Sequence, residues 1–140
     1  MWNALTGLTF VGLRFAWISN ENKLVELFSQ ASVKSSDQTY EFSKYLWSYL
    51  DLRDAVLSIE QVAVSNFQGV DVFNVAAPQI FVNKPTQELI YKYFPECEIK
   101  KELEAFRSPI SSEKFISKFG YRPKFLFDVS RNAMIDTDNF

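Results

Sequence analysis

The spacing of hydrophobic positions changes several times along the chain, and each change predicts a different element. Residues 7–15 are apolar at nearly every position and rich in aromatic and β-branched side chains, which is typical of a strand covered on both faces. Leu24, Val25 and Phe28 then recur at helical spacing and predict a short helix face. The polar, Ser-rich stretch 31–40 predicts a loop.

A strand, a helix and a second strand are predicted next. The strands cover residues 46–50 and 70–76, and the helix runs from Asp54 to about Asn66, with Asp51 or Asp54 as its N-cap. This order indicates a crossover unit on a parallel sheet. The helix is expected to bury an apolar face made of Ala55, Val56, Ile59, Val62 and Ala63.

Two further helices have clear start and stop signals. The first follows residues 83–86 with Thr86 as its cap, and Pro95 ends it. The second begins after Ser111 and stops at Gly120, which is suited to a left-handed C-terminal position. Residues 131–140 show no pattern, so we expect one domain over residues 1–130 and an irregular tail.

Composition narrows the classes of function. The 140 residues contain no histidine, which removes the commonest general base and most zinc sites, and Cys97 is the single cysteine, so no metal site is expected. A net charge of -2 argues against nucleic-acid binding. The apolar opening 5–18 contains Arg14 and is too short to span a bilayer. It has no signal-peptide features either, so a cytoplasmic protein without membrane contact is expected.

Three stretches in order resemble the extended short-chain dehydrogenase/reductases, the NAD-dependent epimerase/dehydratase family. Residues 7–15 (GLTFVGLRF) are similar to the sixth strand of the family's sheet, which ends in Leu-Arg. Residues 47–55 (WSYLDLRDA) resemble the segment that leads into the following helix. Residues 72–76 (VFNVA) and 119–123 (FGYRP) complete the match, which covers about residues 5–123.

The resemblance implies an α/β fold: the C-terminal part of a Rossmann-like epimerase/dehydratase, with a few mostly parallel strands, helices and a small substrate-side lobe. The four glycines are scattered and form no phosphate-binding turn. The family's catalytic Tyr and Lys precede the Leu-Arg strand, so no catalytic residue is assigned. We therefore expect the substrate-binding half of an enzyme that acts on a sugar-like or carbonyl substrate. NAD or NADP would serve the full-length enzyme, and this chain alone is expected to bind neither and to be inactive.

The resemblance also suggests substrate-binding residues near the first strand. Arg14 ends that strand, and the alternative for it is an ion pair at the strand edge. Phe15 and Trp17 follow in a stretch that passes near the nicotinamide and the substrate in the family. Residues 16–19 (AWIS) depart from the family's usual Asn-Val-Tyr-Gly-Pro, which argues against nicotinamide contact.

Trp47, Tyr49 and Arg107 complete the predicted substrate site. Nucleotide-sugar epimerases often have an arginine at the position of Trp47 that meets a diphosphate, which an indole cannot do. A UDP-sugar is therefore less expected here. The alternative for Trp47 and Tyr49 is a place in the core. Arg107 lies before the last helix, where family members place a substrate-binding arginine, and the alternative is a surface position.

Two other functions stay open. The chain would be a stand-alone binding or interaction module derived from the family, or a small complete enzyme using Tyr40 and Lys44, which match the family's Tyr-x-x-x-Lys spacing. That pair follows the Leu-Arg strand instead of preceding it, so coincidence is the favoured interpretation. The expected partner is the missing N-terminal cofactor-binding half, or a homo-oligomer that covers the exposed sheet edge.

Overall fold

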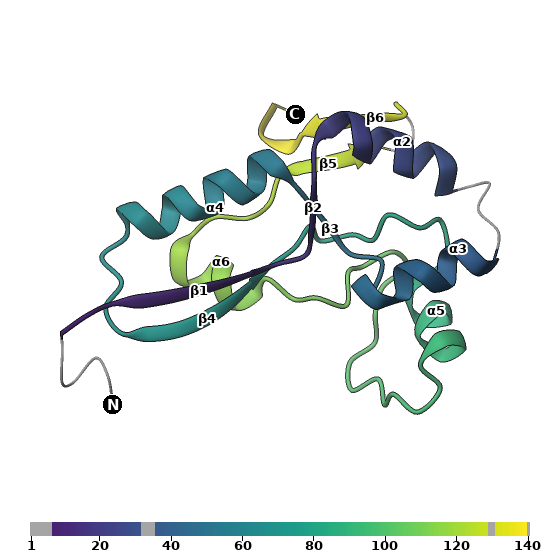
Figure 1. The fold of residues 1–140 in the computed structure, drawn as a ribbon, viewed down its shortest axis with the longest axis horizontal. Coiled ribbons are helices and arrows are strands. Elements are labelled where there is room, and N and C mark those ends of the chain that lie inside the picture. Colours follow the sequence, from purple (N-terminus) through teal and green to yellow (C-terminus); the bar gives the residue numbers. More distant parts are fainter. Residues whose placement is uncertain (1–6, 32–35, 129–130, 140) are drawn as a thin grey trace.

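The computed structural model describes residues 7–31, 36–128 and 131–139, which form a mixed α/β fold of small sheets and short helices (Figure 1). The strands are β1 (Phe10–Phe15), β2 (Trp17–Ser19), β3 (Tyr49–Asp51), β4 (Val70–Val75), β5 (Phe125–Asp128) and β6 (Ala133–Asp136). The helices are α2 (Glu21–Ala31), α3 (Ser36–Glu41), α4 (Leu52–Val64), α5 (Thr86–Tyr93) and α6 (Glu113–Phe119), with short 3-10 helices at Phe42–Tyr45 and Thr137–Asn139. No helix in the described ranges is long and apolar enough to cross a membrane.

The predicted strand–helix–strand order and the parallel pairing of strands are confirmed, but β3 and β4 lie in separate two-stranded sheets instead of one. β1 pairs with β4 in parallel, from Phe10 opposite Val70 onward, and β2 pairs with β3 in parallel. α4 connects β3 to β4. The strand β3 begins later than predicted because Leu46 and Trp47 have left-handed φ values of 51° and 53° and form a turn before it.

Two segments predicted to be irregular are partly ordered. α3 lies inside the predicted loop 31–40, of which residues 32–35 fall outside the described part. β6 lies inside the predicted tail 131–140 and pairs with β5 in an antiparallel manner. Both elements contact the core: the carbonyl oxygen of Thr39 accepts the indole N–H of Trp47 at 2.9 Å, and Met134 is buried. Such tertiary contacts leave no periodic signal in short polar sequences.

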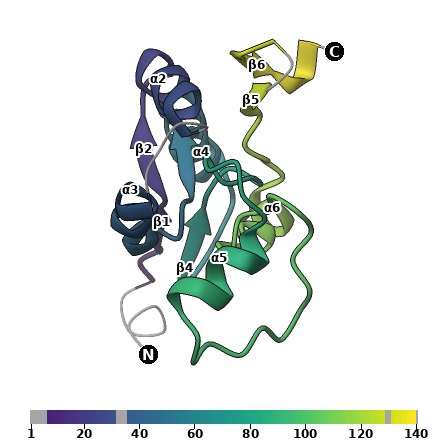
Figure 2. The ribbon, with the colours of Figure 1, turned by 90° about the vertical axis from the view of Figure 1, so that its right-hand side faces the viewer.

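The core consists of two hydrophobic clusters. One lies between α2, β3, the segment after β4 and the β5–β6 pair, and it includes Leu24, Trp47, Tyr49 and Phe81. β5 and β6 contact α2, and the three elements lie along the upper side of the molecule in Figures 1 and 2. The other cluster lies between β1, β4, α4 and α6 and is centred on Phe73.

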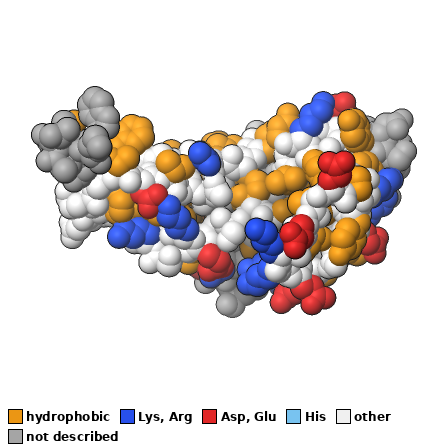
Figure 3. Space-filling model, turned by 90° about the horizontal axis from the view of Figure 1, so that it is seen from below, with side chains coloured by type: hydrophobic (Ala, Val, Ile, Leu, Met, Phe, Trp, Pro, Cys, Tyr) orange, Lys and Arg blue, Asp and Glu red, His pale blue; other side chains and the backbone are white. Residues whose placement is uncertain are grey.

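Among the residues that the structure describes, only one face of the β1–β4 sheet is covered, so the prediction of burial on both faces was wrong. Phe73 and Val75 face the core under α4 and α6. On the other face the exposed fractions are 65% for Phe10, 55% for Val70 and 40% for Val72. Figure 3 views the molecule from the side on which β1 and β4 lie in Figure 1, and hydrophobic side chains there are exposed among charged ones.

Helix α4 begins at Leu52, two residues before the predicted start at Asp54, and its apolar residues are divided between core and solvent. Asp51 is the N-cap, and its carboxylate accepts the backbone N–H of Arg53 at 2.8 Å. Ala55 is buried and Val62 packs on the core, whereas Val56 and Ile59 are exposed. The predicted apolar face was therefore wrong in part. The reason is Asp54. Its side chain is fully buried, so the face of α4 that carries Asp54 points toward the core.

The Asp54 carboxylate ties the first turn of α4 to the chain after α6. It accepts the phenol of Tyr121 at 2.5 Å and the backbone N–H groups of Lys124 and Phe125 at 2.9 and 3.1 Å. Burial raises the pKa of Asp54, and these three hydrogen bonds oppose the rise without cancelling it. Burial and the hydrogen bond to Asp54 also raise the pKa of Tyr121, so this phenol stays protonated.

The raised pKa of Asp54 predicts a specific pH dependence of stability. Between the unfolded pKa of about 4 and the higher folded value, the native state holds more protons than the unfolded state. The free energy of unfolding should therefore fall as pH rises through that window and level off above it. Denaturant unfolding of the wild type and of Asp54→Asn at several pH values measures this pH dependence, because the variant lacks the ionisable carboxyl group. Equal slopes for the two proteins would contradict the prediction.

The two helices that follow β4 in the sequence start differently from the predictions. α5 has Pro85 at its N-cap position, and the hydroxyl of Thr86 donates to the carbonyl of Arg107 at 2.7 Å instead of capping the helix. α6 starts at Glu113, whose N–H donates to the hydroxyl of Ser111 at 3.3 Å. Gly120 ends α6 with a φ of 73°, as predicted.

Candidate functional site

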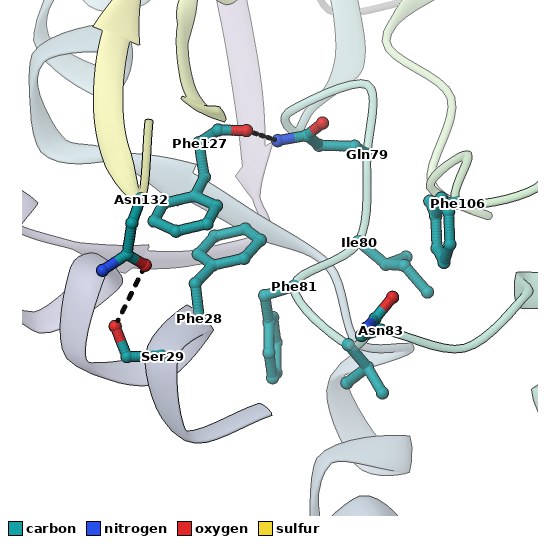
Figure 4. Close-up of a pocket in the computed structure, with 10 residues that line it drawn as sticks. Phe28, Ser29, Gln79, Ile80, Phe81, Asn83, Phe106, Phe127 and Asn132 are labelled. Atoms are coloured by element: carbon teal, nitrogen blue, oxygen red, sulfur yellow. Dashed lines mark hydrogen bonds between the residues drawn. The ribbon is translucent and has the colours of Figure 1, made fainter. Parts of the chain in front are cut away.

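A cavity of about 440 Å³ lies between α2, the segment that follows β4 and the β5–β6 turn (Figure 4). This volume is in the range of small-molecule sites. The segment 76–83 leaves the carboxyl end of β4, where ligands bind in open parallel sheets. The lining residues are aromatic, aliphatic, hydroxyl or amide in type: Phe28, Ser29, Gln79, Ile80, Phe81, Val82, Asn83, Phe106, Phe127 and Asn132.

The aromatic side of the cavity is held rigidly. The rings of Phe28 and Phe127 stack with centroids 4.0 Å apart and an interplanar angle of 8°. Phe28 also meets the ring of Tyr49 edge-on at 5.2 Å. Figure 4 shows Phe28 and Phe127 face to face on one side of the cavity and Phe106 on the opposite side. Such packed rings provide a preformed apolar surface.

Gln79 is the polar residue with the most defined orientation. Its Nε2 donates to the phenol oxygen of Tyr49 at 2.9 Å and to the carbonyl oxygen of Phe127 at 3.1 Å. A carbonyl can only accept, so this contact fixes which end of the amide is nitrogen. No buried side-chain N or O atom in the described part of the chain lacks a partner. The Oε1 atom of Gln79, which has no such bond to a described residue, is therefore accessible as an acceptor.

Tyr49 supports the cavity from behind through contacts with Gln79 and Phe127. Its phenol oxygen accepts from Gln79 and, at 3.4 Å, from the backbone N–H of Phe127. Burial raises the pKa of Tyr49 far above neutral pH, so the phenol stays protonated. The residue thus positions Gln79 and β5 against each other.

Two further amides lie at the cavity. Asn132 has a left-handed φ of 50° in the turn between β5 and β6, a conformation that asparagine tolerates well. Its Oδ1 accepts from the Ser29 hydroxyl at 3.4 Å, and Ser29 also donates to the carbonyl of Val25 at 2.8 Å. Asn83 is exposed. These side chains offer donors and acceptors but no charge.

A second cavity of about 630 Å³ lies along the connector between α5 and α6, and it shares Gln79 and Phe106 with the first. Three contacts anchor the connector. The hydroxyl of Thr86 donates to the Arg107 carbonyl, and the hydroxyls of Ser48 and Ser108 lie 2.8 Å apart. The hydroxyl of Ser112 accepts the Ala76 N–H at 2.8 Å and donates to the Ala76 carbonyl at 3.0 Å.

The structure separates the three predicted site residues of the first strand. Arg14 is exposed on the open face of the β1–β4 sheet, opposite Asn74. Phe15 packs against the Phe73 cluster. Trp17 stacks near Phe42 and Tyr45 and meets Phe81 edge-on at 5.8 Å, so it lies against the other cluster. None of the three lines the first cavity.

The other three predicted residues lie closer to the site. Trp47 and Tyr49 are fully buried in one cluster, and the indole of Trp47 contacts Tyr93 and Phe94. Tyr49 does not line the first cavity itself but contacts three residues that do, Gln79, Phe28 and Phe127. Arg107 is exposed and lines the second cavity.

The Tyr40–Lys44 pair does not form a catalytic arrangement among the contacts of the described residues. Tyr40 is exposed at the end of α3, and its ring lies 6.0 Å from that of Tyr93. The ammonium of Lys44 pairs with Glu41 at 3.9 Å. No three acidic or cysteine side chains in the described part of the chain come together in a group that could hold a metal ion.

None of the six predicted site residues lines the first cavity, so the sequence analysis missed its lining residues, including Gln79, Phe106, Phe127 and Asn132. One signal was present: Gln79 is a polar residue within an otherwise apolar run after a predicted strand. Phe127 and Asn132 gave no signal because the β5–β6 pair was not predicted. A comparison of the chain with models of known protein families and with curated proteins finds no match to either.

Proposed function

We propose that this chain forms the substrate-binding part of an NAD(P)-dependent epimerase, dehydratase or reductase that acts on a sugar-like or carbonyl substrate. A separate cofactor-binding part, of Rossmann type, would cover the β1–β4 sheet and supply the cofactor and the catalytic groups. The resemblance of three sequence stretches to the epimerase/dehydratase family motivates the choice of chemistry.

One observation carries the proposal: a parallel sheet with an apolar face left open. Parallel sheets occur almost only with both faces covered, because crossover connections place helices on each side. In this chain α4 and α6 cover one face, and the other exposes Phe10, Val70 and Val72. An apolar sheet face of this kind supports a partner that packs on it.

The two edges of the same sheet support this partner as well. At the outer edge of β4, the backbone N–H of Val72 donates to the Asp71 carboxylate at 2.7 Å, and the Val72 carbonyl accepts from Lys114 at 3.0 Å. Side chains therefore occupy the backbone groups of Val72 that an added strand would bind at that edge. Along the other edge of β1, no strand among the described residues pairs with it. The open edge adjoins the open face.

The test is assembly with a cofactor-binding domain of the epimerase/dehydratase family supplied by co-expression. We expect a complex that binds NAD(H) in isothermal titration, whereas the isolated chain gives no binding heat. Val72→Asp places a charge on the open face and should weaken the complex at least about tenfold. Val64→Asp, at an exposed position at the end of α4, is the matched control. Binding of NAD(H) by the isolated chain would overturn the proposal.

The alternative is a stand-alone binding module derived from the same family. The stacked rings of Phe28 and Phe127 favour this alternative, because they form one wall of the cavity within a single chain. Light scattering of the purified chain separates the two proposals. A monomer that stays in solution and binds no hydrophobic dye at Phe10 and Val72 supports the module. Self-association that Val72→Asp removes supports the need for a covering partner.

A further inference from the structure

We propose that the cavity beside Phe28 and Phe127 binds an uncharged ring compound that carries hydroxyl groups, and that it does so without the cofactor-binding part. The claim that this compound is the substrate of an enzyme rests on the proposed function. The claim that it binds to this chain rests on the cavity alone.

The apolar walls fit the faces of a ring. Phe28 and Phe127 stack against each other, which holds the aromatic wall in place before any ligand arrives. Phe106 forms part of the opposite side on the anchored connector (Figure 4). A ring placed between these walls would replace water on apolar surface, which favours binding without any charge.

The polar groups fit hydroxyls. Gln79 uses both hydrogens of its amide on Tyr49 and Phe127, so the atom left for a ligand is the acceptor Oε1. An acceptor held in this way requires an O–H or N–H donor on the ligand. The amide of Asn83 at the cavity offers both a donor and an acceptor. A hydroxyl group can satisfy either.

No charged side chain is among the described residues that line the first cavity. Arg131, which precedes Asn132, pairs with Asp128 at 3.4 Å. Arg107 lines the second cavity. The charge distribution therefore favours a ligand without phosphate in the first cavity.

The test uses phenyl β-D-glucopyranoside as the uncharged probe and uridine 5′-diphosphate as the anionic one. Both are titrated into the full chain, and binding is followed by calorimetry and by shifts of the side-chain amide signals in NMR spectra. We expect the glucoside to bind at least about tenfold tighter than the diphosphate and to shift the Gln79 and Asn83 amide signals. Equal or tighter binding of the diphosphate would overturn the proposal, and so would no binding of the glucoside.

Variants locate the site without disturbing the core. Phe106 is 43% exposed, so Phe106→Ala should keep the thermal unfolding midpoint close to wild type. It should weaken the glucoside about tenfold through the lost apolar contact. Tyr91→Ala, an exposed aromatic outside the cavity, is the matched control and should leave binding unchanged. Unchanged binding by a folded Phe106→Ala would place the ligand elsewhere. If this test fails, only the ligand proposal is overturned. The proposed function is tested separately, by assembly with a cofactor-binding domain.

Discussion

Replacing Trp47 by alanine is expected to lower the free energy of unfolding by about 4 kcal/mol, the largest loss we predict for any single substitution. The indole is fully buried and contacts the rings of Tyr93 and Phe94. Alanine would leave a cavity between β3 and α5 and free the carbonyl of Thr39, which accepts the indole N–H. Denaturant unfolding followed by circular dichroism measures the effect.

A matched variant separates packing from hydrogen bonding at this position. Trp47→Phe keeps an aromatic ring but loses the bond to Thr39, so we expect a smaller loss of about 1 to 2 kcal/mol. If Trp47→Ala unfolds within about 1 kcal/mol of the wild type, the indole is not part of the core. A folded Trp47→Ala that loses ligand binding alone would instead restore Trp47 as a substrate-contacting residue.

Replacing Asp54 by alanine is the second large effect, with an expected loss of about 3 kcal/mol. The carboxylate accepts three hydrogen bonds, from the Tyr121 phenol and from the backbone N–H groups of Lys124 and Phe125. Alanine would leave these donors without an acceptor in a site closed to water. Because the same contacts hold the chain before β5, hydrogen exchange should also become faster at Phe125 than in β4.

Tyr121→Phe serves as the graded control for this anchor. It removes one of the three donors and leaves the backbone contacts in place, so a loss of about 1 kcal/mol is expected. A loss for Asp54→Ala no larger than that for Tyr121→Phe would contradict the role of the carboxylate as a shared acceptor.

Elements with strong local signals were predictable from the sequence. The apolar runs at 7–15 and 70–76 form β1 and β4, and the helix predicted between the strands at 46–50 and 70–76 is α4. Asp51 caps α4 and Gly120 ends α6, because each of these positions has one backbone requirement that few residue types meet. The mixed α/β class follows from these elements.

The functional side of the molecule was less predictable, as Gln79 illustrates. Its role depends on Tyr49, thirty residues away, and on Phe127, forty-eight residues away. The spacing of apolar residues predicts neither partner, because the hydrogen bonds of Gln79 reach residues on different elements. Phe127 and Asn132 also required β6 to pair with β5, and the sequence 131–140 carries no alternation strong enough to predict that.

The sequence by itself determined where the chain is apolar and which residues cap α4 and end α6, Asp51 and Gly120, since these signals depend on residues within a few positions of one another. Tertiary structure alone decided which apolar surfaces are covered. Val56 and Ile59 of α4 face solvent because the buried carboxylate of Asp54 fixes the rotation of the helix, and one face of the β1–β4 sheet stays open because both neighbouring helices pack on the other. The same long-range packing placed Gln79 and the stacked rings of Phe28 and Phe127 around one cavity.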